Sequence, residues 1–167
     1  MIKPAVFLDR DGVINFDKGY VYKIEDFEWI NGAINAIKFL NKRDYLVFVV
    51  TNQSGIARGY YTEQDVNNLH NYINEELMKN NALINDFFYS PYHPDFPELY
   101  RDLSNLRKPD TGMLEMAEKK WNFEKSMSFL IGDKESDLLC AKKFGVKGYL
   151  FDQTNLLNFV RNLFLSE

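Results

Sequence analysis

The sequence predicts an α/β protein whose parallel sheet is covered by helices on both faces. Short apolar runs of strand length alternate along the chain with segments whose apolar residues recur at helical spacing, and this alternation is typical of parallel sheets. The run YLVFVV at 45–50 is β-branched and aromatic almost throughout, as expected of a strand buried on both faces. The 167 residues contain no internal repeat or linker, so we expect one domain spanning residues 1–167.

The first half of the chain supplies three predicted strands and two predicted helices. An apolar run at 5–8 predicts the first strand, and residues 31–43 place Ala, Ile and Leu at the spacing of a helix. After the strand at 45–50, residues 62–78 predict a second helix, which opens with a threonine followed by two acidic residues in its first turn, a capping pattern. An aromatic run at 86–89 predicts a short third strand.

The second half begins with an irregular stretch at 90–108 that contains three prolines and has no clear period. Pro109 suits the first turn of a helix that continues to about residue 121. The alternation of strands and helices then resumes. The remaining predicted elements are a strand at 126–131, a helix at 135–144 with Gly145 just past its end, a strand at 148–151 and a closing helix at 155–165.

Composition and charge argue against several classes of function. The formal net charge of −4 disfavours a nucleic-acid partner or an anionic membrane surface, because both attract basic proteins. Cys140 is the single cysteine, so an intrachain disulfide is excluded and a reducing compartment is favoured. The sequence shows no secretory signal and no apolar run long enough to span a bilayer. We therefore expect a cytoplasmic protein, and we expect a monomer.

The carboxyl ends of the predicted strands carry the residues with the most chemistry, and ligands bind at these ends in open α/β sheets. Asp9 and Asp11 follow the first strand, and Thr51 ends the second. Asp133 follows the strand at 126–131, and Asp137 comes one helical turn later. The predicted topology would bring all of these side chains to one edge of the sheet.

Crowded carboxylates are tolerated where a hard cation such as Mg²⁺ neutralises them, and an aspartate can act as a covalent nucleophile toward phosphorus. A second carboxyl two positions on can protonate the leaving oxygen and then deprotonate water. Thr51 and Lys108 could hold the charge of the transferring phosphoryl group. Taken alone, Thr51, Asp133 and Lys108 are more typical of a turn or helix start, a surface loop and a solvated lysine. Their joint occurrence at successive strand ends is what favours a site.

Four motifs, in order along nearly the whole chain, resemble those of the haloacid dehalogenase superfamily of phosphotransferases. They read FLDRDGVIN, TNQSGIARGYYT, RKPDTGML and IGDKESD. Within the superfamily they look most like the D-glycero-D-manno-heptose 1,7-bisphosphate phosphatases, and next like the related histidinol-phosphatase domains. The resemblance implies a Rossmann-like, doubly wound, mainly parallel sheet with helices on both faces and no large cap domain.

The resemblance also implies roles for individual residues. Asp9 would be the nucleophile and Asp11 the general acid/base, while Thr51 and Lys108 would stabilise the phosphoryl group. The implied magnesium ligands are Asp9, the backbone carbonyl of Asp11 and Asp133, supported by Asp137. The implied substrate-binding residues are Asp17, Lys18, Gly19, Tyr20, Asn52, Gln53, Ser54, Arg107 and Lys134.

One loop departs from the family pattern. Relatives usually carry a structural zinc site there, with Cys-x-His and Cys-x-Cys motifs ahead of the RKP segment. The corresponding residues of this chain are Ser90, Tyr92, Ser104 and Leu106, and the lone His93 without thiolate partners makes a poor zinc site. We therefore expect no zinc and a loop held by its aromatic residues, leucines and prolines.

Together, these observations predict a Mg²⁺-dependent phosphatase that acts through an aspartyl-phosphate on a small phosphorylated sugar. The implied substrate is heptose 1,7-bisphosphate, cut at C7, which would place the enzyme in the supply of lipopolysaccharide precursors. Arg107 would then hold the phosphate that stays. Two alternatives stay open: a histidinol-phosphate phosphatase, and a non-catalytic phosphosugar-binding protein on the same fold. Dehalogenation is disfavoured because a proton shuttle and a Mg²⁺ site serve phosphoryl transfer.

Overall fold

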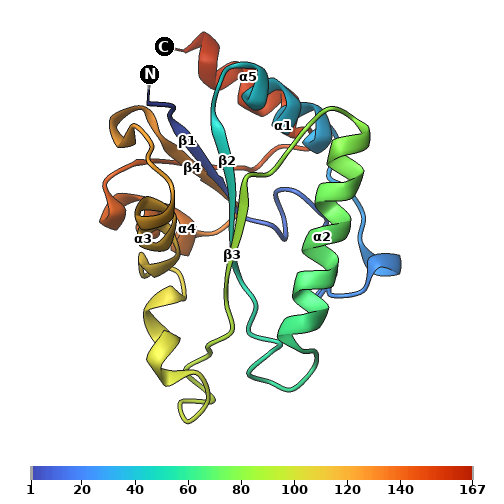
Figure 1. Ribbon diagram of the computed structural model, residues 1–167, viewed down its shortest axis with the longest axis vertical. Coiled ribbons are helices and arrows are strands. Elements are labelled where there is room, and N and C mark those ends of the chain that lie inside the picture. The colour runs from blue at the N-terminus through green and yellow to red at the C-terminus, as the bar shows by residue number, and fades with distance from the viewer. Residues whose placement is uncertain (1, 167) are drawn as a thin grey trace.

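The computed structural model describes residues 2–166 and contains a parallel sheet of five strands (Figure 1). The strand order β3-β2-β1-β4-β5 places the first strand at the centre. The strands are β1 (Ala5–Leu8), β2 (Leu46–Asn52), β3 (Asp86–Ser90), β4 (Phe129–Gly132) and β5 (Lys147–Leu150). Every neighbouring pair runs parallel, so all carboxyl ends meet at one edge of the sheet.

Helices cover both faces of the sheet (Figure 1). The α-helices are α1 (Ala33–Lys42), α2 (Glu63–Lys79), α3 (Gly112–Lys120), α4 (Glu135–Phe144) and α5 (Leu156–Leu165). Residues of α1, α2 and α5 share one hydrophobic core with the sheet, and residues of α3 and α4 share the other. The predicted fold class, a Rossmann-like doubly wound α/β fold, is confirmed.

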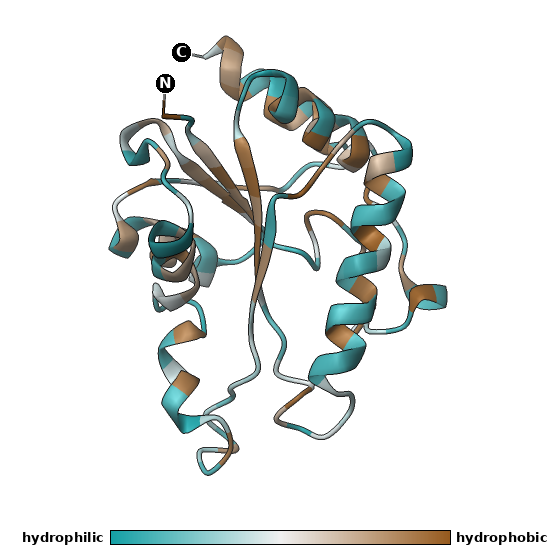
Figure 2. Cartoon of the chain, viewed as in Figure 1, coloured by the Kyte–Doolittle hydropathy of each residue, from teal (hydrophilic) through white to brown (hydrophobic). Residues whose placement is uncertain are grey.

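The central strands are apolar on both faces because their side chains pack into both hydrophobic cores. In β1, Val6 and Leu8 belong to the core under α1, whereas Ala5 and Phe7 belong to the core under α3. All four side chains are fully buried. Phe48 of β2 packs against Phe7 with ring centroids 5.5 Å apart. Figure 2 shows these central strands largely in the colour of hydrophobic residues. Because both faces of the strands are buried, their sequences lack the alternation of polar and apolar residues that a half-exposed strand has.

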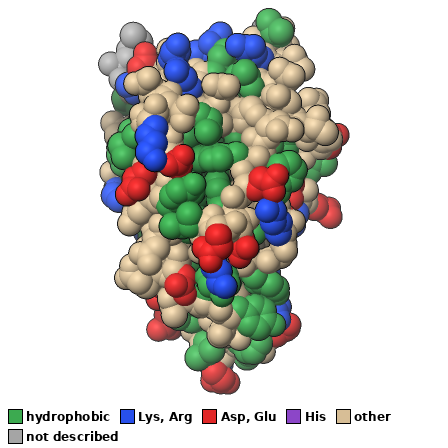
Figure 3. Space-filling model, turned by 90° about the vertical axis from the view of Figure 1, so that its right-hand side faces the viewer, with side chains coloured by type: hydrophobic (Ala, Val, Ile, Leu, Met, Phe, Trp, Pro, Cys, Tyr) green, Lys and Arg blue, Asp and Glu red, His purple; other side chains and the backbone are tan. Residues whose placement is uncertain are grey.

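Helix α2 has one apolar stripe and a polar outer surface. It buries Leu69, Ile73 and Leu77 at helical spacing, as the sequence predicts. Figure 3 shows the side of the molecule that lies on the right in Figure 1, where α2 is found. On this side, acidic and basic side chains lie beside one another around a strip of hydrophobic side chains. None of the described helices combines the length and apolarity that a membrane span requires.

Several element boundaries differ from the sequence prediction, and each has a local cause. Helix α3 begins at Gly112 and not at Pro109, because Pro109 lies in a turn in which the Asp110 amide donates to the Arg107 carbonyl at 2.9 Å. Two short 3₁₀ helices, at Arg101–Leu106 and Lys125–Met127, occupy positions predicted as irregular or as strand. These 3₁₀ helices of six and three residues are too short to show an apolar period in the sequence.

The start of α2 provides a test of local stability. Thr62 and Asp65 form a reciprocal capping box, in which the threonine oxygen accepts from the Asp65 amide at 3.1 Å and the Asp65 carboxylate accepts from the Thr62 amide at 2.8 Å. Thr62→Ala should lower the free energy of unfolding by about 1 kcal/mol, as measured by chemical denaturation. The matched control is Thr111→Ala, since Thr111 precedes α3 without a capping hydrogen bond. Equal losses in the two variants would contradict the capping role.

Candidate active site

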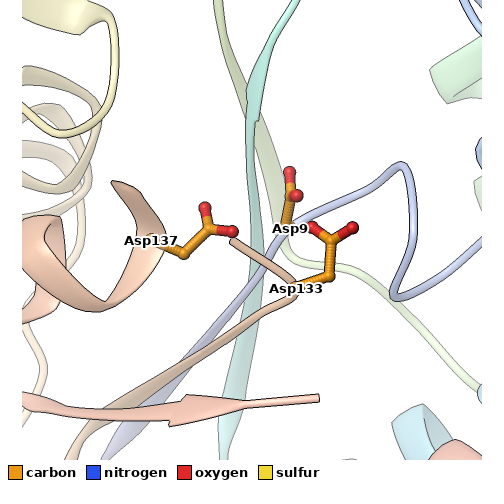
Figure 4. A group of neighbouring side chains, drawn as sticks. All are labelled: Asp9, Asp133 and Asp137. Carbon is orange, nitrogen blue, oxygen red and sulfur yellow. The ribbon is translucent and has the colours of Figure 1, made fainter. Parts of the chain in front are cut away.

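Three aspartates converge at the carboxyl edge of the sheet (Figure 4). Asp9 follows β1, Asp133 follows β4, and Asp137 lies in the first turn of α4. One carboxylate oxygen from each lies within 4.8 Å of the others. The strand order explains this meeting, because β1 and β4 are neighbours in the sheet.

A buried lysine neutralises part of this charge. The Lys108 ammonium donates to Asp9 Oδ1 at 2.9 Å and to the Val50 carbonyl at 2.7 Å, and it lies 2.6 Å from Asp137 Oδ1. Burial alone would lower the pKa of Lys108, but the two carboxylates outweigh it and raise the pKa above its ordinary value. Lys108 is therefore a fixed cation inside the protein. The Asn52 amide holds its backbone from both sides, at 2.9 and 3.1 Å.

Asp9 contacts the same lysine, but the charge of Lys108 does not fully offset the burial of Asp9 and its neighbouring carboxylates. Burial raises the pKa of Asp9, Lys108 lowers it, and the neighbouring Asp137 and Asp11 raise it again, to about 8. Without a further cation, the site therefore favours a protonated Asp9. A bound cation would favour the ionised carboxylate that a nucleophile needs.

The arrangement of Asp133 fits a hard divalent cation. Its Oδ1 atom is buried and has no hydrogen-bond partner among residues 2–166, and a buried carboxylate oxygen without a partner is costly. Gly12, at φ +89°, lets the backbone pass close by, since a Cβ there would lie 2.1 Å from Asp133 Oδ2. Asp137 differs, because its oxygens already contact Lys108 and accept from the Lys134 amide at 3.1 Å. Asp9 and Asp133 are thus the carboxylates with room for a metal ion.

The carboxylate of Asp11 is held by three side chains. Asn15 Nδ2 donates to Oδ1 at 3.0 Å, and Gln53 Nε2 donates to Oδ2 at 3.0 Å. Arg10 Nη2 lies 3.1 and 3.2 Å from the two oxygens. These donors define the orientation of the Asp11 carboxylate.

The amide of Gln53 links the two strand ends. Its nitrogen donates both to Asp11 and to the Thr51 hydroxyl, the latter at 2.8 Å, while its oxygen accepts from the Tyr61 hydroxyl at 2.5 Å. Gln53 and Thr51 are both buried. The polar atoms of the Gln53 side chain are therefore engaged within the protein.

Two hollows that share part of their lining open beside these groups. The smaller, of about 50 Å³, is lined by Asp9, Asp11, Asn52, Lys108, Lys134, Ser136 and Asp137. The larger, of about 220 Å³, is lined by Asp11, Asp17, Gly19, Tyr20, Asn52, Gln53, Ser54, Tyr61 and Lys134. Asp11, Asn52 and Lys134 line both. A ligand with one end at Asp9 would extend into the larger hollow, whose lining is mainly polar.

Two residues of the predicted substrate set lie elsewhere. Lys18 lines neither hollow, and its ammonium pairs with Glu28 at 2.8 Å. Arg107 also lines neither, and its Nη1 donates to the Tyr92 carbonyl at 3.4 Å. Burial lowers the pKa of Arg107, and the nearby charge of Arg58 lowers it further. The guanidinium groups of Arg58 and Arg107 thus form a basic cluster at the loop that precedes α3.

The structure adds residues that the sequence analysis did not single out. Arg10, Asn15 and Tyr61 act on Asp11 directly or through Gln53, and His70 of α2 contacts Arg10. A charged residue between two aspartates reads as part of a solvated turn, so nothing in the sequence signalled that Arg10 is fully buried. Asn15 and Tyr61 belong to the motifs FLDRDGVIN and TNQSGIARGYYT. Their place in these motifs could have indicated that they belong to the site.

Comparisons with known proteins identify the class. The family described as polynucleotide kinase 3 phosphatase matches residues 6–156. A solved structure, D,D-heptose 1,7-bisphosphate phosphatase from B. bronchiseptica complexed with magnesium and phosphate, superposes with a TM-score of 0.79 at 28% identity, covering 96% of this chain and 86% of that chain. With this fold and this arrangement of aspartates, the chain belongs to the haloacid dehalogenase-like phosphatases and is a phosphoric monoester hydrolase.

Within this class, similar curated proteins are named as heptose 1,7-bisphosphate 7-phosphatases. A D-glycero-beta-D-manno-heptose-1,7-bisphosphate 7-phosphatase of Haemophilus ducreyi is 43% identical over 88% of this chain and 81% of its own length. A protein of the same name from Rhodopseudomonas palustris is 40% identical over 98% of this chain and 91% of its own length. The resemblance predicted from the motifs is confirmed.

The raised pKa of Asp9 makes the stability of the metal-free protein depend on pH. Asp9 ionises near 3.8 when unfolded but holds its proton to about pH 8 when folded, so the folded state binds more protons between these values and loses stability as the pH rises. In EDTA, the free energy of unfolding of Asp9→Asn relative to wild type should rise by more than about 1 kcal/mol between about pH 5 and pH 8.

The control for this pH series is Asp44→Asn. Hydrogen bonding to Lys3 lowers the pKa of the exposed Asp44, so its stability difference from wild type should be flat over the same range. A flat difference for Asp9→Asn as well would show that Asp9 is ionised throughout in the folded protein.

Proposed function

We propose that this phosphatase is magnesium-dependent, forms an aspartyl-phosphate on Asp9, and hydrolyses D-glycero-D-manno-heptose 1,7-bisphosphate at C7. The observation that carries the proposal is the contact of the Asp9 carboxylate with the buried Lys108 ammonium at 2.9 Å, in a hollow that Asp11 also lines. A phosphoryl group there would meet a nucleophile, a cation and a proton donor together.

The reaction proceeds in two steps, formation of the aspartyl-phosphate and its hydrolysis. Asp9 attacks phosphorus and the bond to the ester oxygen breaks, while Asp11 gives its proton to that oxygen. Water then attacks the phosphorus of the aspartyl-phosphate and the bond between phosphorus and the Asp9 oxygen breaks. Asp11 takes a proton from the water, the Asp9 carboxylate is restored and inorganic phosphate leaves. Lys108 stabilises the negative charge on the phosphoryl oxygens, with the Thr51 hydroxyl in support. Asp137 fixes Lys108 through its contact at 2.6 Å.

Magnesium would be held by the carboxylates of Asp9 and Asp133 and by the backbone carbonyl of Asp11. The buried, unpartnered Asp133 Oδ1 supports this assignment, since oxygen ligands suit a hard cation. Bound there, the ion would neutralise the crowded carboxylates and polarise the phosphoryl group.

The larger hollow would receive the sugar. Lys134 and Asn52 line both hollows, so they would contact the substrate beside the reacting phosphate. Asp17, Gly19, Tyr20 and Ser54 would contact the sugar hydroxyls and ring. Gln53 would act by orienting Asp11 and Thr51, because its own amide is engaged with them. We propose small phosphosugars rather than nucleic acids as substrates, and a cytoplasmic location.

The loop before α3 would need no zinc. Arg58 hydrogen-bonds His93 Nε2 at 3.1 Å and lies 5.5 Å from the Phe96 ring centroid. His93 Nδ1 also lies 3.1 Å from the Asp95 amide nitrogen. These contacts tie the loop to the segment after β2. Metal analysis of the untagged protein tests this: stoichiometric zinc would contradict it.

The nucleophile is tested by asparagine variants. Asp9→Asn should abolish phosphate release, because an amide does not form the aspartyl-phosphate, and EDTA should abolish it in the wild type until Mg²⁺ is added. Asp11→Asn should lower kcat by about 10²–10⁴-fold, as expected for loss of general acid/base catalysis. Asp44→Asn, at an exposed aspartate, is the matched control and should keep wild-type rates. Near wild-type turnover by Asp9→Asn would refute the covalent mechanism.

The names of the relatives support the bisphosphate assignment, and the basic cluster of Arg58 and Arg107, outside the lining of the two hollows, would hold the second phosphate. A guanidinium grips phosphate through parallel hydrogen bonds. Arg107→Ala should therefore lower kcat/KM for the heptose bisphosphate by about tenfold or more, since a charge-assisted hydrogen bond contributes about 1.5–3 kcal/mol. The same variant should barely affect a small monophosphate. The control Arg101→Ala, at an exposed arginine in the 3₁₀ helix before Arg107, should affect neither substrate. Equal losses on both substrates, or none on either, would contradict the assignment.

A further inference from the structure

Arg10 stands between the two aspartates of the mechanism, yet its side chain is fully buried. It is the largest of the fully buried side chains among the described residues. Burying a guanidinium is costly unless charge and hydrogen bonds compensate for the lost water. The groups around Arg10 must therefore supply charge and hydrogen bonds that offset this cost.

The guanidinium reaches the Asp11 carboxylate and two further groups. Its Nη2 lies 3.1 and 3.2 Å from the two oxygens of Asp11 and donates to the Val21 carbonyl at 2.5 Å. Its Nη1 lies 3.2 Å from Nε2 of His70. Among the donors to Asp11, Arg10 is charged and contacts both oxygens, whereas Asn15 and Gln53 are neutral and contact one each.

His70 supports Arg10 from α2. It is 4% exposed and stacks on the Phe87 ring, with centroids 4.5 Å apart and planes 18° apart. Burial lowers the pKa of His70 well below its ordinary value, and the charge of Arg10 lowers it further. A neutral imidazole is able to accept a hydrogen bond, so Nε2 faces Arg10 as an acceptor. The stacked ring thus fixes the far side of the guanidinium.

We propose that Arg10 is a positioning residue, which holds the Asp11 carboxylate in the direction needed for its proton transfers and is itself held by His70. This inference rests on the proposed function, in which Asp11 protonates the leaving oxygen and later accepts a proton from water. Arg10 lines neither of the two hollows at the site, so it acts through Asp11 and not on the substrate.

The competing explanation is structural. Through the Val21 carbonyl, Arg10 also ties the segment after β1 to the rest of the fold, and its loss could damage the whole site. The two explanations differ in one measurable respect. An ester whose leaving group is a weak base needs little help from a general acid, whereas a sugar phosphate needs a proton on its leaving oxygen. Damage to the whole site would slow both esters alike.

The test compares these two esters in Arg10→Met, which keeps the length of the side chain and removes its charge and donors. We expect kcat/KM for the sugar phosphate to fall by about 10²-fold, the cost of a misplaced catalytic group. For 2,4-dinitrophenyl phosphate it should fall roughly threefold or less. The matched control is Arg43→Met, at an exposed arginine that packs on Phe39, and it should affect neither ester. Equal losses on the two esters in Arg10→Met would overturn the proposal.

A second comparison asks whether Arg10 acts through Asp11. In an Asp11→Asn background, Arg10→Met should cause no further loss on the sugar phosphate, because the group that it positions is already gone. A full additional loss would overturn the proposal.

His70→Leu provides a milder variant should Arg10→Met fail to fold. It leaves Arg10 in place and removes one hydrogen bond, so a roughly two- to tenfold loss confined to the sugar phosphate is expected. An unchanged ratio between the two esters in His70→Leu, if Arg10→Met is unfolded, would overturn the proposal. Failure of the proposed function itself would look different, since wild-type protein would then release no phosphate or Asp9→Asn would retain its activity.

Discussion

The contact between the buried Lys108 ammonium and the carboxylates of Asp9 and Asp137 is the constraint on which the site depends. None of the three groups is stable in the interior alone, because a buried unpaired charge is strongly destabilising. Lys108 accounts for part of the negative charge, and the raised pKa of Asp9 shows that it does not account for all of it. The remaining deficit is what makes the site suited to a cation and to a phosphoryl group, whose transfer depends on positive charge placed in advance.

The topology of the sheet creates this crowding. Because β1 lies between β2 and β4, the residues that follow three neighbouring parallel strands meet at one edge. The helices add to it, since α4 begins beside the site with Asp137 in its first turn, where an acidic residue also suits the helix dipole. Gly12 removes the one Cβ that would displace Asp133. The site is therefore a consequence of strand order and local backbone shape.

Much of this was predictable from the sequence, and the exceptions have physical causes. Asp9 and Asp133 could be placed because buried strands end just before them, and Thr62 because a capping box has a fixed spacing. The true start of α3 was missed because a proline suits a tight turn as well as the first turn of a helix, and Pro109 lies in a turn closed by the Asp110 amide and the Arg107 carbonyl. The burial of Arg10 was missed for a different reason, since its partners Val21 and His70 come from other segments of the chain. Local patterns locate side chains along an element, but contacts between elements decide which of them are buried.

The central claim is that Asp9 carries the phosphoryl group during turnover. The most direct test uses Asp11→Asn, in which hydrolysis of the intermediate should be slow, with 2,4-dinitrophenyl phosphate as a donor that needs little acid catalysis. After acid quench and borohydride reduction, an aspartyl-phosphate becomes homoserine, which mass spectrometry of the peptides can locate. Our account predicts homoserine at position 9 and at no other aspartate, and only after exposure to the donor. Phosphate release from this variant without any modification of Asp9, or with homoserine at another position, would contradict it.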